Sequence, residues 1–342
     1  MAITRIQLER FTAFEKLDFK PSPGMNLLIG ANGTGKTHLM KVAYAACDIT
    51  KSGQRFPEKL TTAFLPRDGA LGRLVKRQGK SATAAVKVSR SGGATLELRF
   101  SNHAKDWRDK KVKRIGGDQW VATPLESVYI PVKEMLASAP GFRSLYAHRQ
   151  IHFESIYADI IDRAFLPILR GPTDEVRRRL LLSLQKAMDG KVTVKREVFF
   201  LKNRQGELEF TLLAEGLRKL GLLWLIIQNG TLTRGSVLFW DEPETNLNPR
   251  LFSVVVEILL ALQRMGVQVF VSTHDYAILK ECELAAKPTD EITYTVMYRP
   301  TPDADVLVET ASEPFRLEHS PIAEAMTSLY NREIQKSLGA QE

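Results

Sequence analysis

The sequence has few of the features that mark secreted, membrane-spanning or metal-cluster proteins. Its 342 residues include two cysteines, Cys47 and Cys282, which lie far apart and outside any metal-type spacing, so we expect reduced, buried thiols. The longest purely apolar runs, such as Leu222–Ile227, have six residues and are too short to span a bilayer. Charged residues interrupt positions 1–20, which argues against a signal peptide. We therefore expect a cytoplasmic protein that does not enter the membrane.

The formal net charge of +9 is concentrated in one stretch of the chain. Residues 51–120 contain 17 Lys and Arg against 6 Asp and Glu, so the remainder is slightly acidic. Such an asymmetry permits binding to a nucleic acid. A basic face that only keeps the protein soluble explains the same asymmetry, and composition does not choose between the two.

Apolar residues alternate as in strands in several segments and follow a helical period in others. This succession predicts an α/β fold with a largely parallel core sheet. Apolar heptads are not sustained, so long coiled-coil arms are not expected. The expected strands are at 3–11, 17–19, 25–30, 125–132, 236–240 and 267–273, and the expected helices are at about 36–47, 216–227 and 250–264. Helical segments are expected over 134–190, interrupted at Pro140–Gly141 and Gly171–Pro172. One hairpin is expected over 82–100, closing at Ser91–Gly93, and another around Asn203–Gly206, with arms at 191–202 and 206–213.

The segment "GANGTGKT", Gly30–Thr37, follows an apolar strand and opens a helix. Its glycines let successive backbone N–H groups face a phosphate, and the helix N-terminus adds partial positive charge. Lys36 can then reach the β- and γ-phosphates of ATP, and the Thr37 hydroxyl is a hard ligand for Mg²⁺. The predicted phosphate-binding residues are Gly30, Ala31, Asn32, Gly33, Thr34, Gly35, Lys36, Thr37 and His38.

Two adjacent acids end a second apolar strand in "LFWDEPETNLNP", residues 238–249. A phosphate-binding loop needs a neighbouring strand that delivers a carboxylate to magnesium, and Asp241 is placed to do so. Glu242 lies just beyond the strand, where it can act as the general base that polarises an attacking water. Bound Mg²⁺ would offset the repulsion between the two carboxylates.

These motifs resemble those of ABC-type ATPase heads of the SMC/RecF/OLD-like group. The resemblance implies a P-loop head with an antiparallel β subdomain and a helical subdomain, and an ATP-dependent dimer. In that family "VFVSTHD" is similar to the switch strand, which makes His274 a γ-phosphate contact, and Asn248 falls in the D-loop that faces the partner. Asn248–Pro249 is also a good helix start on local grounds.

The family's signature motif, which binds the partner's γ-phosphate, is most similar here to "LLAEGLRKLG", residues 212–221. Ala214 stands where serine is usual and Glu215 where glycine often occurs. Backbone N–H groups at Glu215 and Gly216 can still present a helix N-terminus to phosphate. The lost hydroxyl predicts slow hydrolysis rather than loss of ATP-driven pairing.

Two further positions are open. By resemblance, Phe14 or Phe11 in "RFTAFEK" would stack on the adenine, although both fit a hydrophobic core equally well. "YIPVKEM" occupies the place of the Q-loop without a glutamine, so Lys133 or Glu134 would substitute. Asp303 and Asp305 in "PDAD" match a TOPRIM-type pair, but the short remaining chain and Pro302 favour a turn.

The resemblance is greatest to stand-alone ATPases of bacterial anti-phage operons, including the PARIS-type ATPase subunit. It implies a nucleotide-switched sensor or scaffold with ATP and Mg²⁺ as cofactors, which self-associates and controls a separate nuclease or toxin. The alternative is a RecF-like DNA-binding ATPase of repair or replication. An ABC transporter motor is disfavoured by the altered signature. We divide the chain into an ATPase core segment (1–50), a basic insertion (51–128), a helical lid (129–190) and a C-terminal core segment (191–342).

Overall fold

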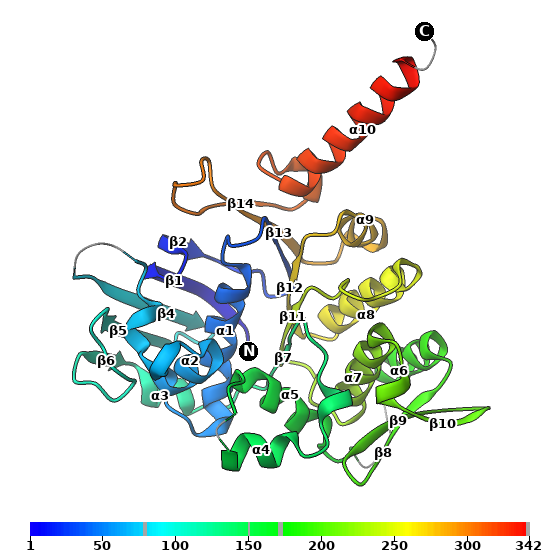
Figure 1. Ribbon diagram of the computed structural model, residues 1–342, viewed down its shortest axis with the longest axis horizontal. Helices are drawn as coiled ribbons and strands as arrows, with labels where there is room; N and C mark the ends of the chain where they lie inside the picture. The colour runs from blue at the N-terminus through cyan, green and yellow to red at the C-terminus, as the bar shows by residue number, and fades with distance from the viewer. Residues whose placement is uncertain (78–80, 150, 170–173, 340–342) are drawn as a thin grey trace.

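A computed structural model describes residues 1–77, 81–149, 151–169 and 174–339 (Figure 1). The interruption expected at Gly171–Pro172 lies outside these residues. The strands are β1 (Ile3–Phe11), β2 (Phe14–Phe19), β3 (Met25–Gly30), β4 (Thr83–Arg90), β5 (Thr95–Ser101), β6 (Val112–Ile115), β7 (Ser127–Ile130), β8 (Lys191–Lys195), β9 (Val198–Asn203), β10 (Gly206–Glu209), β11 (Val237–Asp241), β12 (Gln268–Thr273), β13 (Ile292–Tyr298) and β14 (Leu307–Ala311). The helices are α1 (Lys36–Ser52), α2 (Phe56–Phe64), α3 (Gly117–Val121), α4 (Phe142–Arg149), α5 (Ser155–Ala164), α6 (Glu175–Met188), α7 (Glu215–Gln228), α8 (Phe252–Arg264), α9 (Tyr276–Ala285) and α10 (Pro321–Gly339).

The central sheet has six strands in the order β14-β13-β3-β12-β11-β7. All neighbours are parallel except β13 and β14, which confirms the predicted parallel core. Strands β3, β11 and β12 are buried along their whole length because both faces of the sheet are covered there. Leu238 and Trp240 of β11 enter one hydrophobic cluster, whereas Val237 and Phe239 enter the other.

The two clusters define the layers of the molecule. One contains α5, α6, α7 and α8 on one face of the central sheet. The other holds α1 between the opposite face and a five-stranded antiparallel sheet of order β2-β1-β4-β5-β6. Figure 1 shows the blue antiparallel sheet on one side of the central strands and α6, α7 and α8 on the other, with α10 projecting away. This arrangement places the N-terminus of α1 at the carboxyl ends of the parallel strands.

The antiparallel sheet crosses the boundary proposed from sequence at residue 50. Strands β1 and β2 were assigned to the core segment 1–50, yet β1 pairs with β4 of the 51–128 insertion. The hairpin of β4 and β5 forms as expected and continues into β6. Segments 1–50 and 51–128 therefore share one sheet, because strand pairing between distant segments is not visible in local patterns.

Two local predictions also change. Helix α1 continues to Ser52, five residues beyond the expected end at Cys47, and stops at Gly53 in a left-handed conformation. Residues 191–203, expected as one arm of a hairpin, form two strands joined at Arg196 and Glu197, which both have positive φ. Such a two-residue turn usually contains glycine or asparagine, so the residue types Arg and Glu did not predict it. The predicted turn at Asn203–Gly206 is present.

None of the helices in the described ranges is both long enough and apolar enough to cross a bilayer.

The two large sheets are joined at one point by a buried glutamine of β12. The Gln268 side chain accepts a hydrogen bond from the Ile3 amide at 2.8 Å and donates to the Ile3 and Ser22 carbonyls at 2.9 and 2.8 Å. Its residue is 1% exposed. The side-chain amide of Gln268 therefore hydrogen-bonds the first strand of the antiparallel sheet to the parallel sheet.

We expect Gln268→Ala to destabilise the protein by about 3 kcal/mol, because it leaves buried backbone groups of Ile3 without partners. The free energy of unfolding in urea measures this change. Gln335→Ala on the exposed face of α10 is the matched control, and equal stability of the two variants would contradict the assigned role.

Candidate functional site

The glycine-rich loop connects the end of β3 to the start of α1 and requires glycine at two positions for steric reasons. A Cβ at Gly30, where φ is 151°, would lie 2.3 Å from the Met297 carbonyl oxygen. A Cβ at Gly35, where φ is 98°, would lie 2.5 Å from the Phe14 ring. By contrast, Ala31, Asn32 and Gly33 are exposed at the loop's tip. The loop is thus tightly held at both ends and open in the middle, as a phosphate cradle must be.

The Lys36 side chain lies inside this loop and binds its carbonyl groups. Its Nζ donates to the carbonyl oxygens of Gly30 and Ala31 at 2.6 and 3.1 Å. Burial lowers the pKa of Lys36, and the carboxylates of Glu242, Asp241 and Glu244 oppose that effect. The Thr34 hydroxyl donates to the Ala31 carbonyl at 2.8 Å. A buried cation is thus positioned beneath the exposed amides of the loop.

Asp241 ends β11 directly beside this loop. Parallel pairing sets Asp241 opposite Ser272 of β12, and Ser272 opposite Leu28 of β3. The carboxylate accepts hydrogen bonds from the hydroxyls of Thr37 at 2.9 Å and Tyr129 at 3.0 Å, and also from that of Ser272. Asp241 is 3% exposed, and within the described ranges no Lys, Arg or His forms an ion pair with it.

This environment fits a divalent cation. A buried carboxylate normally has a cationic partner, whereas Asp241 has only neutral hydroxyl donors. Oxygen atoms of the Thr37 hydroxyl and the Asp241 carboxylate, both hard ligands suited to Mg²⁺, already lie within 2.9 Å of each other. In the described part of the chain, no cluster of three or more His, Cys, Asp and Glu side chains could hold a metal alone. Other ligands would have to come from substrate phosphates and water.

Glu242, the residue after Asp241, lies beside His274. The His274 Nδ1 atom lies 3.2 Å from Glu242 Oε1, and the His274 side chain is 51% exposed. Glu242 has a positive φ of 48°, while its amide donates to the Ser272 carbonyl at 3.1 Å. Its other carboxylate oxygen accepts from the Thr245 hydroxyl at 3.3 Å. The sequence-predicted residues Lys36, Thr37, Asp241, Glu242 and His274 are therefore brought to one sheet edge.

Sequence reasoning missed a third acid that supports this pair. The Glu244 carboxylate accepts from the Thr273 hydroxyl at 2.7 Å and from the His274 amide at 3.1 Å. Burial raises the pKa of Glu244. The only available signal was its spacing in "DEPET". Tyr129 and Ser272 were missed because their contact with Asp241 depends on strand order.

The signature-like segment packs against the segment that follows Glu242. Helix α7 begins at Glu215 with Ala214 as its N-cap, which provides no side-chain hydrogen bond. A Cβ at Gly216 would lie 2.7 Å from the Asn246 carbonyl oxygen, and the Asn246 side chain donates to Glu215 at 3.0 Å. Buried Lys219 donates to the Thr245 carbonyl at 2.7 Å. Residues 214–216 and 244–248 thus pack against each other and leave Ala214, Asn246 and Asn248 exposed.

The local role predicted for Asn248 is confirmed. Its side chain accepts a hydrogen bond from the Arg250 amide at 3.0 Å, and Pro249 follows at the first position of a short 3₁₀ turn. Its contact with a second copy stays a prediction.

Two weaker predictions are not supported by the side-chain positions. Phe14 and Phe11 are both fully buried, and Phe14 lies against Gly35, so neither ring presents a face to a base. Glu134 is also buried, and its carboxylate contacts the Leu136 amide and Arg218. Lys133 is exposed. Of the two Q-loop candidates, Glu134 is committed to an internal ion pair.

His38 follows Thr37 on α1, and its ring is largely buried at the base of the loop. Its ring packs against Phe64 at 5.3 Å between centroids, and its Nδ1 atom is buried without a hydrogen-bond partner in the described structure. Burial and the nearby Lys41 lower the pKa of His38 to about 4. The folded protein therefore resists protonating this ring.

Since the unfolded chain binds this proton near pH 6.5 and the folded chain only near pH 4, stability is lost as pH falls through that window. Between pH 7 and pH 5 we expect wild type to lose about 2 kcal/mol more than His38→Gln. Urea denaturation at both pH values measures this difference. His103→Gln, at an exposed loop histidine, should behave as wild type; the same behaviour from His38→Gln would refute the assignment.

Curated proteins similar to this chain include DNA replication and repair proteins RecF and a Rad50 ATPase. RecF of Chlorobium luteolum is 31% identical over 102 residues, which cover 30% of this chain and 27% of that protein. RecF of Limosilactobacillus reuteri is 26% identical to this chain over a segment that covers 44% of this chain and 37% of that protein. The DNA double-strand break repair Rad50 ATPase of Thermoplasma volcanium is 26% identical over a segment that covers 40% of this chain and 16% of that protein. The chain spans less than two-fifths of each relative.

Solved structures establish the fold. An SMC head bound to the C-winged helix domain of ScpA aligns with a TM-score of 0.56 at 12% identity, covering 91% of this chain and 98% of that one. A Pyrococcus furiosus SMC head bound to the C-terminal domain of ScpA aligns with a TM-score of 0.53 at 12% identity, and the alignment covers 97% of this chain and 99% of that one. Residues 25–280 match the family described as "AAA domain, putative AbiEii toxin, Type IV TA system". The chain therefore belongs to this AAA-domain family, and it has an SMC-head fold.

Proposed function

We propose that the protein binds and hydrolyses ATP with Mg²⁺ at the edge formed by β3, β11 and β12. The observation that carries this proposal is the buried Asp241 carboxylate, which lies beside Thr37 and has no ion-pair partner in the described structure. Lys36 and the exposed loop amides supply positive charge for the phosphates. When bound, Mg²⁺ would neutralise the charge that develops on the transferring phosphoryl group.

Glu242 is the proposed general base. It is partly exposed, with 23% of its side chain accessible, and its carboxylate is held between His274 and Thr245. Glu244 accepts a hydrogen bond from the His274 amide, and the His274 imidazole lies beside Glu242. His274 can therefore orient the carboxylate and contact the γ-phosphate. General-base catalysis of this kind typically contributes about 10²–10⁴-fold to rate.

We further propose that two copies enclose two ATP molecules. The surface of residues 214–216 and 244–248 presents the start of α7, whose backbone N–H groups can bind a phosphate of the other copy. Ala214 offers no hydroxyl, which supports slow turnover. Phosphates buried between copies stabilise the pair over the single chain, so ATP binding drives association and hydrolysis reverses it.

Biologically, we propose a nucleotide-switched sensor or scaffold that controls a separate effector, a nuclease or toxin, in anti-phage defence. The family description, which names a toxin and a Type IV TA system, supports this class of role. So does the resemblance of the motifs to the ATPase subunit of PARIS-type systems.

Replacing Glu242 with Gln should trap the ATP-bound pair. We expect the Glu242→Gln variant to double its mass in MgATP, measured by light scattering, and its turnover to fall by about 10²–10⁴-fold. Adding Lys36→Ala should abolish the mass change, because the phosphate contact is lost. A Glu242→Gln protein whose mass is indifferent to MgATP would contradict the pairing.

A RecF-like, DNA-binding ATPase is the second candidate. It is favoured by the similarity to RecF and Rad50 proteins and by the basic residues 51–120. Arg73 and Arg77 line a small cleft of about 250 Å³, whereas Lys76 of the same segment is paired with Asp305 and Glu15. Arg73 and Arg77 are therefore the better placed to contact phosphates.

If this candidate is right, log K for duplex DNA should fall steeply with log salt concentration. Arg73→Glu with Arg77→Glu should flatten that slope in fluorescence anisotropy titrations. Arg332→Glu with Lys336→Glu on α10 gives the same charge change away from the segment and should keep the slope. A flat slope for wild type would eliminate this candidate.

A further inference from the structure

A second cleft lies at the opposite end of α1 from the phosphate-binding loop. It has a volume of about 790 Å³ and is bounded by the end of α1, the start of α2, and the β5, β6 and α3 segments. We call it the α1–β6 cleft. Its lining includes Lys51, Arg55 and Arg114, and apolar side chains Leu96, Val112 and Val121. This size is in the range of small-molecule sites.

The cations of the α1–β6 cleft are poorly neutralised. In the described parts of the chain, neither Arg55 nor Arg114 forms an ion pair with a carboxylate. The Arg55 guanidinium instead lies over the Trp107 ring, 5.8 Å from its centroid, an interaction that leaves the charge in place. Lys51 pairs with Glu126, which also faces Arg163. The single acid in the lining is Asp118.

Acids in the adjacent connector are hydrogen-bonded to backbone amides, and in the described structure they form no ion pair with Arg55 or Arg114. The Asp109 carboxylate accepts from the backbone amides of Lys105 and Lys111 at 3.0 and 2.9 Å. The Asp106 carboxylate accepts from the Arg108 amide at 2.6 Å. These acids shape the turn that positions the basic connector. The result is a concave, cationic site with an apolar wall, which suits a phosphate group attached to a small organic body.

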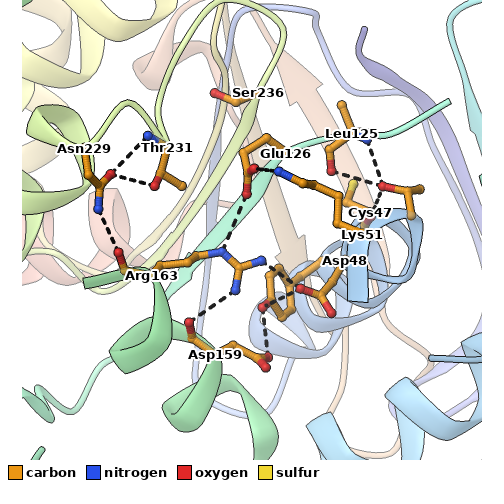
Figure 2. A network of polar contacts seen from close by, with 12 residues as sticks. Cys47, Asp48, Lys51, Leu125, Glu126, Asp159, Arg163, Asn229, Thr231 and Ser236 are labelled. Carbon is orange, nitrogen blue, oxygen red and sulfur yellow. Dashed lines mark hydrogen bonds and ion pairs between the residues drawn. The ribbon is translucent and has the colours of Figure 1, made fainter. Parts of the chain in front are cut away.

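The cleft is also connected to the rest of the molecule through a buried polar network (Figure 2). Arg163 of α5 contacts Asp48 of α1 at 2.7 Å, and its Nε atom lies 3.8 Å from Glu126. Lys59 of α2 bridges Asp48 and Asp159 at 2.8 and 2.6 Å. Although burial alone would raise the pKa of Asp48, Lys59 and Arg163 hold it below its usual range. Lys51 joins this network to the cleft.

The same network reaches the phosphate end of α1. The Tyr44 hydroxyl contacts Asp159 at 2.9 Å, and the Tyr44 ring packs edge-on against Tyr129 with centroids 5.5 Å apart. Tyr129 donates to Asp241 at 3.0 Å. One helix thus carries Lys36 at its start and Lys51 near its end, with buried polar contacts between them.

We propose that the α1–β6 cleft binds a phosphate-bearing small molecule of about nucleotide size, and that Lys51 and Glu126 transmit its occupancy to the nucleotide site. An anion in the cleft competes with Glu126 for Lys51. Glu126 then interacts with Arg163 alone. Because Arg163 of α5 also contacts Asp48 of α1, this change alters the ion pairs between α1 and α5. The binding step is independent of the proposed ATPase activity, whereas transmission rests on it.

The binding step is tested with AMP, which lacks the β- and γ-phosphates that Lys36 is placed to hold. Isothermal titration uses a Lys36→Ala background, so that the phosphate-binding loop contributes little. We expect binding that weakens at least about tenfold in Arg55→Ala with Arg114→Ala, since two charge-assisted contacts are lost. Arg332→Ala with Lys336→Ala removes the same charge from α10 and should bind as the background does.

Gly117→Leu gives a steric test that leaves every cation in place. A Cβ at Gly117 meets no atom within 4 Å, so the new side chain can occupy the cleft without disturbing its walls. We expect the same loss of AMP binding with unchanged melting temperature. Absence of AMP binding in the background, or binding that survives both the double arginine variant and Gly117→Leu, would overturn the site. Binding of a 12-nucleotide single strand but not AMP would also overturn it.

Transmission is tested by steady-state turnover of the wild type with and without AMP. Occupancy of the cleft should change kcat at least about twofold, whereas simple competition at the loop would raise KM and leave kcat unchanged. Glu126→Gln should still bind AMP but show no change in kcat. A kcat response in Glu126→Gln equal to that of wild type, or a pure KM effect, would refute transmission. Should the protein prove unable to hydrolyse ATP, the titrations still decide the cleft by themselves.

Discussion

The burial of the Asp241 carboxylate among neutral hydroxyl groups is the constraint around which the site is built. A charge in this position is unfavourable unless it is hydrogen-bonded and finally paired with a cation. Its donors come from three different elements: Thr37 from α1, Tyr129 from β7 and Ser272 from β12. The strand order β3-β12-β11-β7 is what brings these three hydroxyls to one carboxylate. A change of neighbour in the sheet would remove at least one of them.

A second concentration of buried charge, around Arg163, joins the helical layer to the core. Asp48, Lys59 and Asp159 are largely enclosed, and their charges balance only as a set. Removing one member of such a set is costly because it leaves an unpaired buried charge. Helix α1 belongs to both concentrations. Its 17 residues extend over about 25 Å, so a shift at either end is carried through a single rigid element.

The SMC-head fold accounts for the position of the candidate site. The SMC-head fold supplies a parallel sheet whose carboxyl ends meet the glycine-rich loop, and the residues of the candidate site lie at that edge. The departures of this chain lie elsewhere. Ala214 caps α7 without a side-chain hydrogen bond, and Glu134 is tied to Arg218. Both residues lie outside the glycine-rich loop and the strand that ends at Asp241.

The sequence alone determined the elements whose signals are local. The glycine loop, the strand ending in Asp241 and Glu242, and the parallel α/β core follow from spacing and periodicity over a few residues, and the structure contains each of them. The pairing of β1 with β4 across the proposed boundary at residue 50 could not be foreseen, because it joins segments about 80 residues apart. Likewise, Phe14 and Phe11 fit both a base-stacking role and a core, and only their burial decided between them. Tyr129, Ser272 and Glu244 became site residues through strand order and side-chain direction. Local patterns record propensity, whereas the balance of buried charge depends on contacts between distant residues, and only the tertiary structure fixes those.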